Sequence, residues 1–99
     1  MKPIDAIFHS DPAHGWLQVP KRTYLAVGYA ASAFSYQDEK FVYLEEDCDA
    51  PRFIKKAEAK GLSFTMSEKT HNGPCFIRNK DQVSGIGFTL IEPKGEGEK

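Results

Sequence analysis

The sequence is poor in cysteine, has no excess of either charge and contains no long hydrophobic run, and each absence excludes a class of protein. The two cysteines among 99 residues are too few for a disulfide framework and form no CxxC metal-binding pair. Thirteen basic and fourteen acidic residues give a net charge of -1, so no overall field attracts nucleic acid or a membrane surface. No apolar run approaches the roughly 18 residues of a membrane span. We therefore expect reduced thiols and neither a nucleic-acid nor a membrane partner.

The sequence also lacks the motifs that fix a reaction mechanism. No GxGxxG, Walker A, GxSxG or HExxH pattern occurs, so nucleotide hydrolysis and serine or zinc proteolysis have no support. The first residues, Met1–Asp5, hold one basic residue and no apolar stretch, unlike a signal peptide. We expect no cofactor and identify no catalytic residue. The 40% of hydrophobic residues is enough to build one domain with a buried core.

Alternation of apolar and polar residues predicts two β-hairpins. Ile4–His9 and His14–Val19 are expected to pair antiparallel through a turn that contains an Asp-Pro step. Ala33–Gln37 and Lys40–Glu45 are expected to form the second hairpin, with aromatic residues at alternate positions. Further strands are predicted at Leu62–Met66, Phe76–Ile77 and Val83–Ile91.

Two helices are predicted, a short one at Lys21–Val27 and a longer one at Ala50–Lys60. Asp49 is the candidate N-cap of the longer helix, Pro51 lies in its first turn and Gly61 is its candidate stop. The buried stripe of this helix is predicted to be Ala50, Phe53, Ile54 and Ala57.

The predicted element order is ββαββαββ. Strands that mostly alternate favour an α+β fold, an antiparallel or mixed sheet with two helices packed on one face. We expect residues 1–92 to form a single compact domain and residues 93–99 to form a flexible polar tail, because the tail has too few apolar residues to pack.

Two short polar segments are the candidate binding site. One is the turn of the first hairpin, and the other follows the second hairpin, where a run of carboxylates precedes the longer helix. If the two hairpins are neighbours, His14 and the carboxylates after Leu44 share one end of the sheet. The candidate binding residues are His9, Asp11, His14, Trp16, Glu45, Glu46 and Asp47.

Each segment has more than one reading. His9, Asp11 and His14 are residue types that ligate zinc, manganese or iron, although their spacing is not that of ligands on a helix. Alternatively, Asp11 caps the turn, His14 packs on Trp16 and His9 is an exposed strand end. The carboxylates either stabilise the helix start or form an acidic patch for a basic protein surface. Cys48 is a poor nucleophile, because the neighbouring carboxylates disfavour its thiolate.

Three runs of this chain resemble a family of small proteins encoded by bacteriophages, prophages and plasmids. The runs are H-S-D-P-A-H-G-W-L from His9, S-Y-Q from Ser35 and Y-L-E-E-D-C-D from Tyr43, with I-R-N from Ile77 as a weaker match. The family carries H-[ST]-D-P-G-H-G-W-L, S-Y-Q and Y-L-E-E-D-C-D. Ala13 stands where the family usually has Gly, so this turn position is not expected to need a positive φ. The resemblance implies that the protein is encoded by a mobile genetic element and lies in the cytoplasm of a bacterial host. It implies no mechanism.

We therefore expect a small non-enzymatic protein of a mobile genetic element that binds a host or phage macromolecule. The expected partner is a protein that meets the acidic patch, and interference with host defence is one purpose that fits this setting. The alternative is a small metal-dependent enzyme that uses His9, Asp11 and His14.

Overall fold

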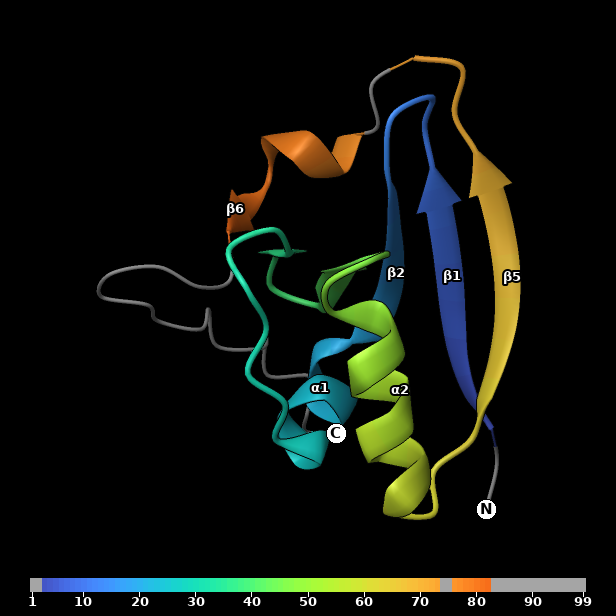
Figure 1. Ribbon diagram of the computed structural model, residues 1–99, viewed down its shortest axis with the longest axis vertical. Coiled ribbons are helices and arrows are strands. Elements are labelled where there is room, and N and C mark those ends of the chain that lie inside the picture. Colours follow the sequence, from blue (N-terminus) through green and yellow to red (C-terminus); the bar gives the residue numbers. More distant parts are fainter. Residues whose placement is uncertain (1–2, 74–75, 83–99) are drawn as a thin grey trace.

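The computed structural model describes residues 3–73 and 76–82, which form a mixed sheet with helices packed on it (Figure 1). Within these residues the strand order is β5-β1-β2-β4-β3-β6. Strands β1 and β5 run parallel, and the other neighbouring strands run antiparallel. The α+β fold expected from the sequence is confirmed. In chain order the elements are β1 (Ile4–Ser10), β2 (Gly15–Pro20), α1 (Lys21–Val27), β3 (Tyr36–Gln37), β4 (Phe41–Glu45), α2 (Ala50–Ala59), β5 (Phe64–Thr70), the 3-10 helix η1 (Phe76–Asn79) and β6 (Asp81–Gln82).

The two α-helices cover one face of the sheet, and the main hydrophobic core lies between them and the strands (Figure 1). Strand alternation turns Leu17 of β2 and Leu44 of β4 towards the helices. Phe53 of α2 lies in this core and is 0% exposed. Its ring contacts Tyr24 of α1 and Phe64 of β5. One aromatic side chain therefore connects both helices and an edge strand.

Local sequence sets both ends of α2. Pro51 stands in the first turn, where its missing N–H leaves no helical hydrogen bond unmade. The helix ends at Ala59, and Gly61 takes a φ of +87°, the left-handed conformation expected of a helix stop. The predicted buried stripe is confirmed, because Ala50, Phe53 and Ala57 are buried and Ile54 packs against them.

The opposite side of the sheet, here named the second face, is covered by η1. Trp16 and Tyr43 alternate with the core residues of β2 and β4 and therefore point to this side. Ile77 of η1 is 0% exposed and packs on both rings. At β2 and β4 the sheet is thus packed on two sides, by the α-helices on one and by a short 3-10 helix on the other.

Two predicted strands differ from the structure: the strand that pairs with β4 is shorter than predicted, and the one at Phe76–Ile77 is absent. The segment from Ala33 is not extended, and β3 is limited to Tyr36–Gln37. Its start is delayed because Ser35 N–H bonds back to the Ser32 carbonyl, 3.2 Å away, in a turn. Phe76 and Ile77 form a 3-10 helix instead of a strand, because a helical turn brings Ile77 down onto the second face.

The fifth strand begins and ends later than predicted, at Phe64–Thr70, because it pairs with β1 along its whole length. The predicted strand Val83–Ile91 and the predicted tail 93–99 lie outside the described residues. In the part of the chain that the structure describes, no helix has the length and apolar character needed to cross a membrane.

Candidate functional site

The two polar segments singled out in the sequence meet at one end of the sheet. Strand β2 lies between β1 and β4, so Trp16 stands opposite His9 on one side and Glu45 on the other. Beyond the strands, the Glu46 N–H donates to the Gly15 carbonyl at 2.9 Å. The expectation that the hairpins are neighbours is therefore confirmed. We name this end the rim; it comprises residues 11–15, 29–35 and 45–49.

Asp11 builds the first turn of the rim. Its Oδ1 accepts hydrogen bonds from the N–H groups of Ala13, at 2.9 Å, and His14, at 2.8 Å. Ala13 has no positive φ, as expected from its side chain. The exposed His14 ring lies 5.9 Å from the Trp16 ring, centroid to centroid. For Asp11 and His14, the structure thus supports the interpretation of this segment as a turn.

Glu45 is not part of an exposed patch. It is 8% exposed, and its Oε1 accepts hydrogen bonds from the N–H groups of Asp47, at 2.9 Å, and Cys48, at 2.8 Å. This carboxylate shapes the connection between β4 and α2. Of the four predicted acidic binding residues, Asp11, Glu45, Glu46 and Asp47, only Glu46 and Asp47 are exposed.

The most highly coordinated group in the rim is the carboxylate of Asp49, which is 2% exposed. It accepts hydrogen bonds from the Ser32 N–H at 3.0 Å, the Ser32 hydroxyl at 2.7 Å and the Tyr29 hydroxyl at 3.0 Å. The Ser35 hydroxyl donates to it as well, and Ser35 Oγ in turn accepts the Glu45 N–H at 2.9 Å. This network ties residues 29–35 to the β4–α2 connection.

The prediction that the Asp49 side chain caps α2 is therefore wrong. The residue precedes the helix with φ −116° and ψ −39°, and its side chain makes no capping hydrogen bond. Its carboxylate faces Ser32 and Ser35 instead. Sequence reasoning missed this network because its members lie 14 to 20 positions apart, beyond any local motif.

The Asp49 network presents Phe34 to solvent. Phe34 is 63% exposed, although its backbone is fixed at both ends. Its N–H donates to Ser32 Oγ at 3.2 Å, and its carbonyl accepts the Trp16 indole N–H at 3.4 Å. Trp16 itself is 2% exposed, so this predicted binding residue supports the rim from inside.

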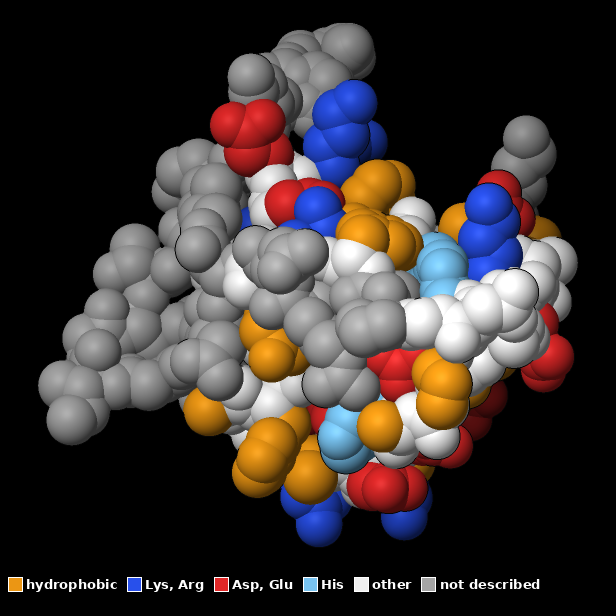
Figure 2. Space-filling model, turned by 90° about the horizontal axis from the view of Figure 1, so that it is seen from above, with side chains coloured by type: hydrophobic (Ala, Val, Ile, Leu, Met, Phe, Trp, Pro, Cys, Tyr) orange, Lys and Arg blue, Asp and Glu red, His pale blue; other side chains and the backbone are white. Residues whose placement is uncertain are grey.

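Seen from above, the molecule shows histidine side chains next to hydrophobic and acidic ones (Figure 2). The exposed aromatic and ionisable members of the rim are His14, Phe34, Glu46 and Asp47; Pro12, Ala13, Ala30 and Ala33 are exposed as well. Their backbones are tied together by the bond between residues 46 and 15 and by the Asp49 network. The rim therefore offers one exposed aromatic ring, one imidazole and two carboxylates on a fixed frame.

The expectation that His9 is an exposed strand end is wrong, and His9 does not belong to the exposed rim. It is 4% exposed and lies on the second face, where Gln18 and His71 bond its two ring nitrogens. The three residues of the alternative metal site, His9, Asp11 and His14, are therefore not brought together. Among residues 3–73 and 76–82, no three histidine, cysteine, aspartate or glutamate side chains are placed to hold a metal ion.

Cys48 has the wrong electrostatics for a nucleophile, as expected. Partial desolvation, a hydrogen bond to Glu45 and the negative charges of Glu45, Asp49 and Asp47 all raise the pKa of the Cys48 thiol. The thiol therefore stays protonated at neutral pH.

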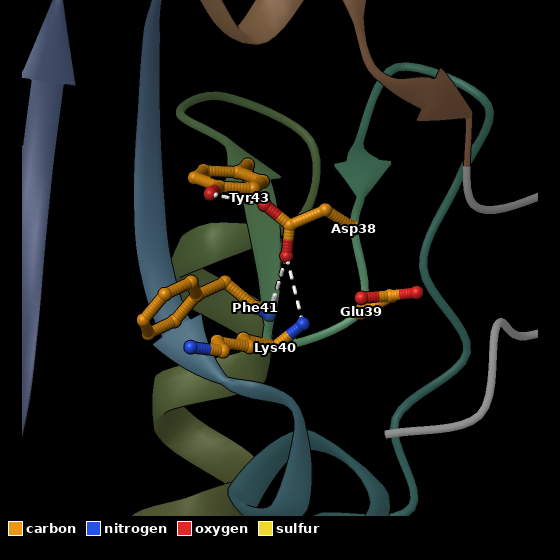
Figure 3. A pocket seen from close by; sticks show the side chains of 5 residues that line it. All are labelled: Asp38, Glu39, Lys40, Phe41 and Tyr43. Atoms are coloured by element: carbon orange, nitrogen blue, oxygen red, sulfur yellow. Dashed lines mark hydrogen bonds between the residues drawn. The ribbon is translucent and has the colours of Figure 1, made fainter. Parts of the chain in front are cut away.

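A hollow of about 340 Å³ lies at the other end of β4, lined by Asp38, Glu39, Lys40, Phe41 and Tyr43 (Figure 3). The Asp38 carboxylate accepts the Tyr43 hydroxyl at 2.8 Å and pairs with Lys80 Nζ at 3.0 Å. Its other oxygen accepts two backbone N–H groups of the hairpin. Although burial acts to raise the pKa of Asp38, the bonds from Lys80, Phe41, Tyr43 and Lys40 lower it on balance. This carboxylate stabilises the hairpin through these hydrogen bonds.

Comparisons with known proteins add no relative: no family model, no curated protein and no solved structure matches this chain.

Proposed function

We propose that this protein is a non-enzymatic binding module whose rim recognises another protein. The observation that carries the proposal is Phe34, which is 63% exposed on a loop that a buried carboxylate holds in place. A large aromatic ring in a fixed position gives binding energy with little loss of conformational freedom. Four large hydrophobic side chains of the described residues are exposed, namely Leu25, Phe34, Met66 and Phe76, and Phe34 is the most exposed of them.

The exposed carboxylates of Glu46 and Asp47 support a partner with a basic surface. Like charges on a partner would be repelled, whereas lysine and arginine side chains around an apolar pocket would match this rim. We therefore propose a protein partner that receives Phe34 in an apolar pocket and contacts the two carboxylates with basic side chains.

The proposed setting is a mobile genetic element in the cytoplasm of a bacterial host, with a host or phage macromolecule as target and counter-defence as one purpose. It rests on the resemblance of the three sequence runs. Those runs, which begin at His9, Ser35 and Tyr43, all contribute residues to the rim or to its support. A shared surface is one reason for such motifs to occur together.

The test is affinity capture from a bacterial lysate with the immobilised full chain, followed by quantitative mass spectrometry. Phe34→Ser and the double variant Glu46→Lys, Asp47→Lys should each reduce the captured partner by about tenfold or more. The matched controls are Leu25→Ser, which removes an equally apolar exposed side chain on α1, and Glu58→Lys on the exposed side of α2. Equal capture by all variants, or loss with the controls as well, would contradict the proposal.

A further inference from the structure

A chain of hydrogen bonds links two histidines and a glutamine on the second face. His9 Nε2 lies 2.8 Å from Gln18 Oε1, and His9 Nδ1 lies 3.1 Å from His71 Nε2. Because an amide oxygen only accepts, His9 Nε2 carries a hydrogen, and its Nδ1 is left with a lone pair. His71 Nε2–H then donates to that lone pair. When both imidazoles are neutral, each of these three ring nitrogens is thus either a donor or an acceptor.

The geometry between the imidazoles is that of a shared proton rather than of two metal ligands. The ring centroids lie 5.4 Å apart with an angle of 29° between the ring planes. That separation is about the 3.1 Å between His9 Nδ1 and His71 Nε2 plus the distance from each ring centre to its own nitrogen. The two nitrogens therefore lie nearly on the line that joins the ring centres. A metal bound by both nitrogens at a tetrahedral angle would need them turned towards a common point.

The pair stands where η1 joins the sheet. His71 follows β5, and its N–H donates to the Ser10 carbonyl of β1 at 2.8 Å. Phe76, the first residue of η1, packs edge-on against His9 with centroids 5.3 Å apart, and it also contacts His71. The next residue, Ile77, is buried against Trp16. The imidazole pair therefore connects the central strands to the segment that covers the second face.

We propose that His9 and His71 form a pH-sensitive latch that holds η1 on the second face and releases it when both imidazoles are protonated. One added proton can be accommodated, because His71 can change tautomer and accept from a protonated His9. A second proton leaves two N–H groups and two positive charges facing each other at hydrogen-bond distance. The bond between β1 and the segment before η1 is then lost.

The surroundings of the pair disfavour positive charge. Strand β5 brings Lys69 to the same face as His9, and Lys80 lies 5.3 Å from the Phe76 ring and 5.5 Å from the Tyr43 ring. Strand β2 contributes the neutral side chains of Gln18 and Trp16. Strand β4 contributes Tyr43 and, opposite Trp16, Glu45, whose carboxylate accepts the N–H groups of Asp47 and Cys48. Asp38 bonds Lys80 and the Tyr43 hydroxyl. Within residues 3–73 and 76–82, no carboxylate makes a hydrogen bond with either imidazole to offset a second charge.

The direction of the pH effect follows from His9. Burial lowers the pKa of His9, the bond to Gln18 opposes this, and His71 and Lys69 lower it further. Above about pH 6.5 both folded and unfolded states hold a neutral His9, so the stabilisation is complete. As the pH falls below that value the unfolded chain binds the proton first, so stability decreases until the lower folded pKa is passed. Acid therefore loosens the latch.

Trp16 is the natural reporter, because it is the one tryptophan of the chain and it packs on Ile77. The measurement is acrylamide quenching of its fluorescence between about pH 7.5 and about pH 5. All proteins carry His14→Gln, since the His14 ring lies 5.9 Å from Trp16 and would quench it by itself when protonated. This leaves His9 and His71 as the only histidines, because the chain has three.

The His14→Gln protein should show quenching that rises about threefold at low pH while far-ultraviolet circular dichroism stays constant, as for local opening. Adding His71→Gln should give high quenching already at neutral pH and little change on acidification. Quenching in the His14→Gln protein that does not depend on pH, or the same pH dependence after His71→Gln, would overturn the proposal.

A second measurement needs no variant. Ring-nitrogen NMR of the unmodified protein at neutral pH should show His9 as the Nε2–H tautomer, with scalar coupling between His9 Nδ1 and His71 Nε2 across the hydrogen bond. The coupling should vanish on acidification. A His9 that is the Nδ1–H tautomer, or absence of coupling at neutral pH, would contradict the latch.

Discussion

Single residues at the rim act through close contacts that local sequence does not reveal. Asp49 was expected to cap a helix and instead gathers hydroxyl and N–H donors from residues 29–35. Gly15 has a similar hidden role, since it lies where β2 starts and the Glu46 N–H reaches its carbonyl. The sequence indicates a turn at Gly15 and a helix start at Asp49. Their partners, however, lie on other strands and loops, so their tasks could not be assigned before the register was known.

At this scale we predict that Gly15→Ala destabilises the protein. An added Cβ would lie 2.4 Å from Phe8 Cζ and 3.0 Å from Glu46 Oε1, and the Phe8 ring packs against the main core and cannot move freely. Such overpacking costs about 1–3 kcal/mol of unfolding free energy. Urea denaturation followed by circular dichroism measures it. The control is Gly73→Ala, where a Cβ meets nothing within 4 Å; an equal loss for both variants would show that crowding at Gly15 is not the cause.

At the scale of elements, prediction succeeded where one helix or strand carries its own pattern. The stripe of α2 and its glycine stop, and the alternation in β2 and β4, indicated the correct elements and faces. It failed where tertiary contacts override local preference. Residues 33–35 alternate like a strand but form a turn in which Ser35 donates to the Asp49 carboxylate. The segment at Phe76 has strand-forming residues but forms a 3-10 helix that packs Ile77 on the second face.

The element on which the core most depends is α2, through Phe53. Its ring contacts Tyr24, Tyr29 and Phe64, three residues from three different parts of the fold. Truncation in Phe53→Ala should therefore lower the unfolding free energy by about 3–5 kcal/mol. For a domain this small, that is a large part of the total stability.

Thermal and urea denaturation measure the effect of Phe53→Ala. Ile54→Ala, at the neighbouring and only partly buried position, should cost clearly less. If both variants lost the same stability, the described packing of α2 against the sheet would be wrong.

For the whole molecule, the structure divides into two systems the polar residues that the sequence suggested as one site. The rim faces solvent with Phe34, His14 and two carboxylates, while the imidazole pair lies on the second face, with His9 buried and His71 partly exposed. His9 and His14 are close in sequence but belong to different systems, because one points from a strand and the other from a turn. His71 could not be linked to His9 from sequence, since 62 positions separate them and only the parallel pairing of β5 with β1 brings them together.

The central claim is that the rim is preformed, with Phe34 held ready for a partner. The most direct measurement is the backbone 15N order parameter of residues 31–35 in the free protein. With the loop fixed by Asp49, we predict values of about 0.85 at Ser32, Phe34 and Ser35, as in rigid secondary structure, and a marked decrease in Asp49→Ala. Values below about 0.6 in the unmodified protein would mean a flexible loop and would contradict a preformed recognition surface.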